Sequence, residues 1–413
     1  MSNEYRNNHY VPQWYQKRFI PEGQIDQELF YLDLKPGTFT DPRGVVHPKR
    51  AVRKQGTRFC FAEDELYTTW FGVERRTAIE QVFFGQIDDH GRDAVDFFGN
   101  YEHFVSGWDG DPLRRMMLYM STQKLRTPKG LDWISQQLNT TDRNDVLRLM
   151  LQLRQLHSAI WVECIWQIAD ASQSDTKFII SDHPVTAYNR FLGPRNKKWC
   201  RGSNDPDITL NATHTVFPLS LDKVLILTNL SWVRNPYQSG IVQRPNPNPM
   251  RPAMFNFQHI QTMRQLSEQE VREINFIVKS RAHRYIAAAQ GDWLYPENHV
   301  SKSDWNTYGD GLLFMPDPRG VEFGGEMIMG WNDGTATAFD EYGRRPWQEG
   351  YGQHAGQGEF STLYQFKGDF ATKFGPYRRG RGLSFGTDVD PEKDTNDMHE
   401  YHLSLARKRS KTK

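Results

Sequence analysis

The chain has 413 residues, and its 51 basic and 50 acidic side chains give a formal net charge of +1 at pH 7. Apolar residues make up 38% of the chain and aromatic residues 13%, which is enough side-chain surface for burial and excludes general disorder. The balanced charge argues against a wholly basic nucleic-acid coat, although a local basic patch is compatible with it. Because one domain usually takes roughly 100 to 200 residues, more than one structural unit is expected.

The N-terminus and the cysteines predict a cytoplasmic protein without a membrane partner. The first ten residues are polar, and no stretch approaches the ~18 to 20 apolar residues that span a bilayer. The three cysteines, Cys60, Cys164 and Cys200, are widely spaced and form no C-x-x-C pair, so neither a disulfide framework nor a thiolate zinc site is expected. Nucleotide-binding, zinc-protease and serine-hydrolase motifs are absent too, so the cofactor and any metal stay unknown.

In the first third of the chain, extended segments are predicted to give way to helices. Residues 8–61 contain five prolines and are predicted to be extended chain with short strands, of which Glu28–Leu34 is one. Helical spacing of apolar residues then predicts an amphipathic helix over Glu65–Ile87. A further helix is expected over Pro112–Arg126, because Asp111 supplies an N-cap and proline is tolerated at the first helical position.

The middle of the chain carries the strongest helical pattern. Apolar residues recur at a period near 3.6 over Asp142–Asp170, which predicts a single helix about 40 Å long. Lys177–Ser181 and Val224–Thr228 are typical of buried strands, and the tract between them is expected to be a long loop. Ser267 followed by Glu270 is a capping box, which predicts a helix that ends near Gln290.

Beyond Pro296 the composition changes, since 17 of the 32 glycines fall between Gly309 and Gly386. A hairpin is expected over Met327–Phe339, because its central Asn, Asp and Gly tolerate positive φ. The predicted fold class is therefore α+β, with a predominantly helical core, a small mixed or antiparallel sheet and a glycine-rich β and loop region at the C-terminal end. The expected units are a core of residues 1–295, an extension of residues 296–386 and a charged, disordered tail of residues 387–413.

His9 is the first candidate for chemistry, because a histidine can donate, accept or shuttle a proton near neutral pH. It precedes Tyr10 and Val11, and Pro12 stiffens the chain beside it. The alternative is an aromatic strand in which the histidine is only hydrogen-bonded.

Gln123 and Arg126 form the second candidate site, since residues three apart share one face of a helix. Arg126 falls at the C-terminal turn before Pro128, where its planar guanidinium can bind a phosphate or a carboxylate. The alternative is an arginine that only caps the carbonyl groups at the end of the helix.

A third candidate site lies in the run Ser181, Asp182 and His183, which directly follows a predicted buried strand. Asp182 can act as a general base, orient His9 or bind a metal, and the two neighbouring side chains can assist it. The alternative is an Asx turn that Asp182 makes before Pro184.

Four short motifs occur in a recognisable order: HYVPQ from His9, QKLRTP from Gln123, SDHPV from Ser181 and FPLSL from Phe217. In this order they resemble the family known as domain of unknown function 4238, over roughly residues 8 to 290. The chain departs from the usual family pattern at His183 and Leu221. The resemblance implies a shared set of polar positions without implying a reaction; that set is His9, Gln13, Gln123, Arg126, Ser181 and Asp182.

We therefore expect an enzyme in which His9 transfers a proton or binds a metal, Asp182 is its partner and Arg126 binds an anionic group. The most concrete form is a nuclease that acts in bacterial defence or as a toxin, with nucleic acid held by a basic patch at Arg378–Arg381 and by the basic tail. Two alternatives stay open. One is a non-catalytic binding or interaction protein whose motif residues form a structural polar network, and the other is a small-molecule hydrolase with an anionic substrate.

Overall fold

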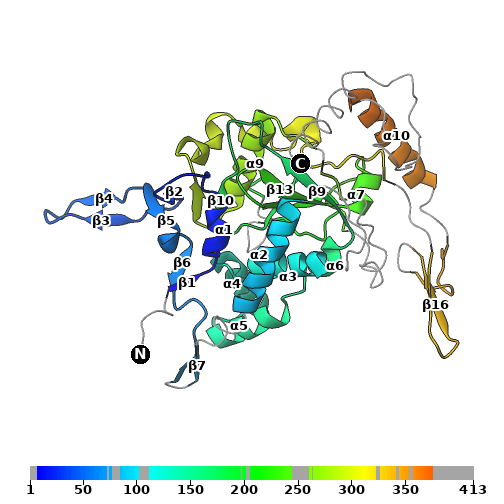
Figure 1. The fold of residues 1–413 in the computed structure, drawn as a ribbon, viewed down its shortest axis with the longest axis horizontal. Helices are drawn as coiled ribbons and strands as arrows, with labels where there is room; N and C mark the ends of the chain where they lie inside the picture. The colour runs from blue at the N-terminus through cyan, green and yellow to red at the C-terminus, as the bar shows by residue number, and fades with distance from the viewer. Residues whose placement is uncertain are drawn as a thin grey trace.

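Two four-stranded antiparallel sheets, with helices around them, form the body of the protein (Figure 1). The computed structural model describes residues 7–71, 74–76, 84–101, 111–196, 198–200, 205–243, 260–262, 264–321, 326–340, 344–352 and 357–374. The first sheet has the order β11-β12-β13-β9, formed by Thr186–Asn189, Thr213–Pro218, Lys223–Asn229 and Cys164–Asp170. The second has the order β10-β14-β2-β5, formed by Ile180–Ser181, Tyr285–Ala288, Glu28–Asp33 and Val52–Gly56.

The helices gather on two sides of these sheets. On one side lie α2 (Gly85–Gly99), α3 (Asp111–Arg126), α4 (Pro128–Leu138), α5 (Arg143–Gln152) and α6 (Ser158–Trp161), and on the other lies α9 (Glu268–Arg281) (Figure 1). Phe98 of α2 packs against Trp166 of β9 with ring centroids 5.3 Å apart, so the helices share their core with the first sheet. Shorter elements in the body are β1 (Asn7–His9), α1 (Gln13–Lys17), β6 (Ala62–Asp64) and α7 (Leu230–Arg234).

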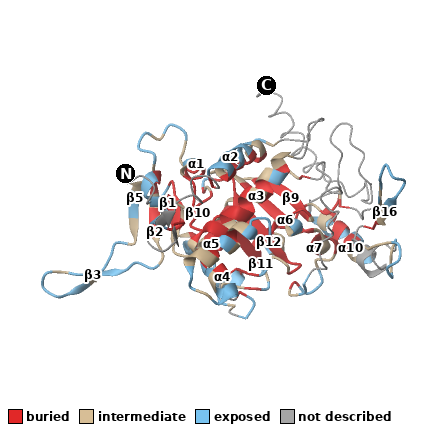
Figure 2. Cartoon of the chain, turned by 90° about the horizontal axis from the view of Figure 1, so that it is seen from below, coloured by how far each residue is buried: buried red, intermediate tan, exposed pale blue. Residues whose placement is uncertain are grey.

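The core is centred on the first sheet, where the buried residues concentrate (Figure 2). Every residue of β12 is buried, and so is every residue of β9 except Asp170. A strand covered on both faces needs no alternation of apolar and polar residues. This explains why the predicted helix Asp142–Asp170 is wrong in its second half: the helix α5 ends at Gln152, and the continuous apolar run after it forms β9.

Three other expectations also need correction. The predicted helix Glu65–Ile87 is wrong, because Thr69–Phe71 (β7) and Glu74–Arg76 (β8) pair as strands and α2 begins only at Gly85. The long loop expected between the two strands contains β11 and β12. The helix opened by Ser267 ends at Arg281 rather than near Gln290, and the chain then enters β14.

Several expectations are confirmed. The α+β class holds, and the strands predicted over Glu28–Leu34 and Val224–Thr228 correspond to β2 and β13. The capping box is present, because Ser267 Oγ accepts the N–H of Glu270 while the Glu270 carboxylate accepts the N–H of Ser267. The predicted C-terminal hairpin is also found, as β15 (Met327–Gly330) paired with β16 (Ala336–Phe339).

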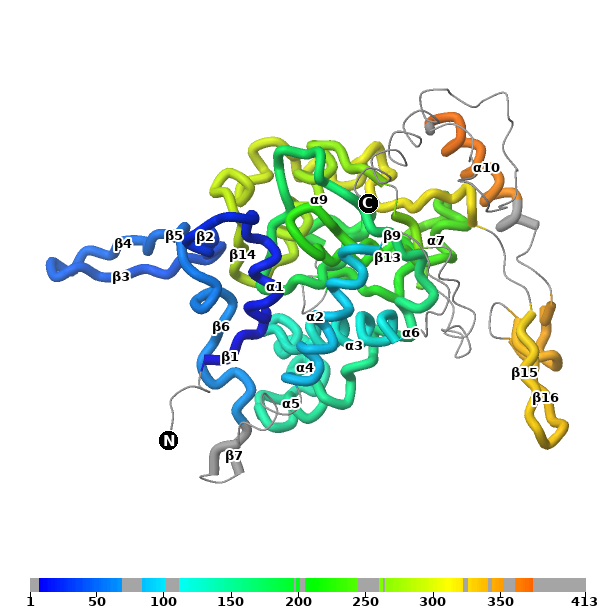
Figure 3. Tube along the Cα trace, in the orientation of Figure 1, coloured from blue at the N-terminus to red at the C-terminus, as the bar shows by residue number. Residues whose placement is uncertain are grey.

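Two hairpins project from opposite ends of the body (Figure 3). One is formed by β3 (Thr38–Thr40) and β4 (Val46–Pro48), and the other is the β15–β16 pair. The helix α10 (Gln357–Phe374) lies in the region predicted to be only strand and loop. The basic patch predicted at Arg378–Arg381 and the charged tail predicted over residues 387–413 lie outside the described residues. Within the described ranges, no helix combines the length and apolar character that crossing a bilayer requires.

Candidate functional site

The turn between α3 and α4 places two lysines on one wall of a pocket. Thr127 is the N-cap of α4, and its Oγ1 accepts the N–H of Gly130 at 3.2 Å. A Cβ atom on Gly130 would lie 2.3 Å from the carbonyl oxygen of Lys124, so the two helices approach this closely only with glycine there. The tight turn directs Lys124 from the end of α3 and Lys129 from the start of α4 toward the same carboxylate.

A second motif brings a histidine to these lysines. After β10, Ser181 Oγ accepts the N–H of His183 at 3.2 Å, which fixes the bend that follows the strand. The imidazole of His183 then lies between the motifs, with Nδ1 2.8 Å from Thr127 Oγ1 and Nε2 3.2 Å from Lys124 Nζ. The QKLRTP and SDHPV segments, far apart in the sequence, therefore meet at His183.

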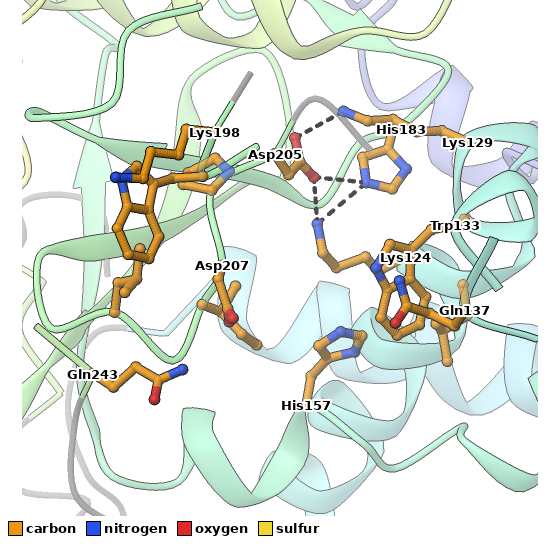
Figure 4. Close-up of a pocket in the computed structure, with 16 residues that line it drawn as sticks. Lys124, Lys129, Trp133, Gln137, His157, His183, Lys198, Asp205, Asp207 and Gln243 are labelled. Atoms are coloured by element: carbon orange, nitrogen blue, oxygen red, sulfur yellow. Dashed lines mark hydrogen bonds and ion pairs between the residues drawn. The ribbon is translucent and has the colours of Figure 1, made fainter. Parts of the chain in front are cut away.

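Asp205 is the centre of the resulting cluster (Figure 4). Its Oδ2 lies 2.7 Å from Lys124 Nζ and 3.2 Å from His183 Nε2, while its Oδ1 lies 2.7 Å from Lys129 Nζ. The side chains of Lys129 and Asp205 are only 4% and 5% exposed, so solvent screens this pair little. Lys129 also donates to the carbonyl of Arg281 at 2.5 Å, which leaves its third N–H without an acceptor among the described residues.

Burial and charge set the protonation of the cluster. Burial lowers the pKa of Lys129 to about 8, although Asp205 opposes this effect. Burial also lowers the pKa of His183 to about 3, helped by the positive charges of Lys124 and Lys129, so the imidazole is neutral at pH 7. Burial alone would raise the pKa of Asp205, but the two ammonium groups outweigh it and hold that pKa well below its usual range. Two cations thus face one anion.

The cluster borders a cavity of about 520 Å³ that opens to solvent. Figure 4 shows Lys198 and Gln243 across the cavity from Lys124, with Asp207 between the two sides. Trp133 is partly exposed and Trp199 is 38% exposed, so both indole rings are accessible to a ligand. The other lining residues are Leu125, Gly130, Gln137, His157, Pro206, Ile208 and Leu210, together with the cluster itself.

His157 adds a second neutral imidazole to the pocket. Its Nδ1 is hydrogen-bonded to Ser121 Oγ at 2.9 Å, and its ring stacks on Trp161 with centroids 5.2 Å apart. Burial is the main cause that lowers its pKa to about 3. The Nε2 atom makes no hydrogen bond to the part of the chain that the structure describes, so it is the ring atom available to a ligand.

Two of the residues predicted from the sequence lie together behind the pocket wall. Gln123 Oε1 accepts from Arg126 Nε at 2.8 Å, and Gln123 Nε2 donates to the carbonyl of Tyr10 at 2.7 Å. The Arg126 guanidinium is buried and pairs with Asp88 of α2 at 2.8 Å. These contacts fasten the HYVPQ segment and α2 to α3.

Asp182 points away from the pocket cluster. Its carboxylate accepts the N–H groups of His283, Arg284 and Tyr285 at 2.8, 2.6 and 2.8 Å. The side chain therefore caps the turn that joins α9 to β14, about a hundred residues along the chain, and these contacts differ from the local Asx turn before Pro184 that was considered as the alternative. Burial raises the pKa of Asp182, while these three hydrogen bonds act against the rise.

His9 lies at the end of β1, where its Nε2 is 3.0 Å from the carbonyl oxygen of Arg58. Burial lowers its pKa. Gln13 is half-buried at the start of α1. Among the contacts of the described residues, the structure joins Gln123 with Arg126 and joins neither with His9 or Asp182.

The residues that converge at the pocket differ from the site residues predicted from the sequence. Lys124 stands inside the QKLRTP motif and Lys129 directly follows it, so the motif was a usable signal for both. His183 was predicted only to assist Asp182, and it departs from the usual family pattern. Asp205 and His157 carried no signal, because nothing in a single sequence links Asp205 to lysines 81 and 76 positions away, or His157 to Ser121 36 positions away.

The fold and the pocket define an α+β protein with a cation-bordered, aromatic-walled cavity, and no metal site of three or more His, Cys, Asp or Glu is found in the described ranges. Residues 159–292 match the model of the family described as protein of unknown function (DUF4238), which supports the predicted resemblance to that family. The match includes SDHPV and FPLSL but not the two earlier motifs. No curated protein and no solved structure matches the chain.

Proposed function

We propose that the chain is an enzyme that binds a phosphate-containing substrate in the pocket beside Asp205, most concretely a nucleotide unit of nucleic acid whose phosphodiester bond it hydrolyses. The observation that carries the proposal is the excess of cations at the pocket. Lys124, Lys129 and Lys198 line it against two carboxylates, and both histidines are neutral. A partly enclosed site with surplus positive charge favours an anionic ligand.

The aromatic walls favour a ligand that also carries a planar ring. Trp133 and Trp199 are accessible, and a base can stack on such rings with a gain of about 1 to 3 kcal/mol. A phosphate near Lys129 and Lys198, together with a base against an indole, describes a nucleotide better than a simple carboxylate. We also propose that the protein uses this activity as a defence or toxin effector.

Hydrolysis needs a base for the attacking water and an acid for the leaving oxygen. We assign the base to His157, because it lines the pocket and its Nε2 is available to a ligand; burial and then Lys124 lower its pKa, and a phosphate bound beside it would act in the opposite direction. We assign the acid to Lys129, whose pKa of about 8 suits proton donation near neutral pH. The water oxygen bonds to phosphorus, its proton passes to His157 Nε2, the P–O ester bond breaks and Lys129 protonates the departing oxygen.

A matched pair of histidine variants tests this activity. Wild-type protein, with and without added divalent cations, is incubated with end-labelled DNA and RNA. His157→Gln is expected to slow cleavage at least a hundredfold, in keeping with the usual contribution of a general base. His90→Gln, an exposed change on α2, should cleave like wild type. Intact substrate with the wild-type protein, or equal cleavage by both variants, refutes the proposal.

The non-catalytic alternative has one specific observation in its favour. Gln123, Arg126 and Asp182 are buried, and their hydrogen-bond partners are backbone groups or other internal side chains. They therefore serve the framework of the pocket, as in the structural polar network expected as an alternative. If the pocket binds nucleotide but no nucleic acid is cleaved, the protein is a binding module built on the same framework.

A further inference from the structure

The hairpin that projects from the second sheet is strongly basic. Residues 35–54, here called the basic arm, contain six basic residues and one acidic residue, a net charge of +5, whereas the whole chain has +1. All six basic side chains are exposed. Although positive and negative charges nearly balance over the whole chain, an excess of positive charge therefore lies on one protruding element.

Most of this charge is not neutralised by the protein itself. Lys54 pairs with Asp26. Lys35, Arg43, Lys49 and Arg50 make no ion pair with any residue that the structure describes. Four unpaired cations on one hairpin repel one another, and a polyanion would relieve that repulsion.

The β3–β4 hairpin of the basic arm is held in shape by contacts of its own. Asp41 accepts the N–H groups of Arg43 and Val45, both at 2.9 Å, which fixes the turn at its tip. Phe39 and His47 face each other across the strands with ring centroids 5.4 Å apart. All of β3 is exposed, so the hairpin leaves its surface open to a ligand.

We propose that the basic arm binds double-stranded DNA, with Lys35, Arg43, Lys49 and Arg50 contacting backbone phosphates. A two-stranded ribbon fits the wide major groove of B-form DNA, whereas the major groove of A-form RNA is too narrow to admit it. Lysine and arginine supply the phosphate contacts that position such a ribbon. This inference adds a substrate class and a second contact surface to the proposed function, but its test measures binding alone.

The arm and the pocket are joined through one sheet. The arm follows β2 and ends in β5, and β10 at the far edge of the same sheet leads directly into Asp182 and His183. Three strand spacings of about 4.8 Å separate β5 from β10, which is roughly 14 Å. The arm and the segment that carries His183 are therefore connected through one sheet.

Four charge-removing substitutions in the arm, compared with four elsewhere, test the proposal. The arm variant is K35Q/R43Q/K49Q/R50Q, and the control is K17Q/R114Q/R148Q/K302Q, which removes the same charge from exposed positions outside the arm. Binding of a labelled 20-base-pair DNA duplex to the full chain is measured by fluorescence anisotropy over a series of salt concentrations.

The arm variant is expected to bind at least tenfold more weakly than the control. Its slope of log affinity against log salt should fall by about 3 to 4, since each lost phosphate contact is worth about 0.9. Equal binding by both variants overturns the proposal. Tighter binding to a duplex RNA of the same sequence also overturns it. So does a result in which the arm variant loses binding to anionic phosphatidylserine vesicles but not to DNA, since Phe39, Val45 and Val46 also lie exposed on the arm. DNA binding that persists without cleavage leaves this inference standing and contradicts only the hydrolase.

Discussion

Lys129 and Asp205 form an ion pair that is almost completely enclosed by protein, with 2.7 Å between Nζ and Oδ1 and side chains 4% and 5% exposed. The other carboxylate oxygen serves Lys124 at the same distance. One carboxylate thus holds two ammonium groups at the wall of the pocket. The stability of the site and its affinity for anions both depend on this shared carboxylate.

Asp205→Asn removes the only negative charge of the described cluster while keeping its shape. The free energy of unfolding is expected to fall by about 3 to 5 kcal/mol, because buried ammonium groups lose their counter-ion. Urea denaturation at pH 7 measures it. Asp207→Asn, an exposed change two residues along the same loop, should stay within about 0.5 kcal/mol of wild type. Equal stabilities for the two variants would show that the pair contributes nothing.

Asp182→Asn tests the cap on the turn between α9 and β14. An amide has one acceptor oxygen in place of two, so at least one of the three backbone N–H groups loses its partner. The free energy of unfolding, measured by chemical denaturation, is expected to fall by about 1 to 3 kcal/mol. The exposed Asp175→Asn is the control. A variant as stable as wild type would show that the Asp182 carboxylate is not needed for the turn, and would contradict its structural role.

Gly130→Ala tests the close approach of α3 and α4. The added Cβ would lie 2.3 Å from the carbonyl oxygen of Lys124, and the backbone would have to shift to remove this clash. The free energy of unfolding is therefore expected to fall by about 1 to 3 kcal/mol. Gly368→Ala in α10 meets nothing within 4 Å and should be neutral or stabilising, since alanine favours helix more than glycine does. Thermal melting of both variants checks the contrast, which fails if Gly130→Ala melts at or above the wild-type temperature.

Acid should weaken the fold through its buried histidines. His157, His183 and His214 each have a folded-state pKa of about 3, lowered mainly by burial from the ordinary 6.5. Between these values the unfolded chain binds more protons, so stability is full above pH 6.5 and is lost as the pH falls toward 3.

Each such histidine contributes a slope of about 1.4 kcal/mol per pH unit well below pH 6.5. His157→Gln should reduce the fall in unfolding free energy between pH 6.5 and 4.5, measured by urea denaturation. His90→Gln, on the exposed face of α2, should leave the wild-type slope unchanged. An unaltered slope in His157→Gln would contradict the buried, neutral state of that ring.

Local signals in the sequence predicted those parts of the fold whose chemistry is local. The capping box at Ser267, the turn in the β15–β16 hairpin and the start of α3 after residue 110 depend only on neighbouring residues. Cys164–Asp170 was misassigned because a strand buried on both faces and a buried helix share the same apolar composition.

The site was only partly predictable for a related reason. The QKLRTP and SDHPV motifs mark the right segments, but adjacent residues in them have different roles. Lys124 and His183 line the pocket. Gln123 and Asp182 instead make hydrogen bonds to backbone groups of the surrounding structure. Successive side chains point in different directions, as Gln123 and Lys124 do on the helix α3, and only the three-dimensional arrangement shows which one reaches the cavity. Asp205 enters the site through a contact that no local pattern encodes.

The most direct test of the pocket is calorimetric titration with a nucleoside 5′-monophosphate. Wild-type protein should bind one equivalent, and Lys198→Gln, an exposed change across the cavity from Lys124, should weaken binding about tenfold without altering the melting temperature. Lys17→Gln, an exposed lysine outside the pocket, should bind like wild type. Absence of saturable binding to the wild-type protein, or equal affinity in all three proteins, would contradict an anion site beside Asp205.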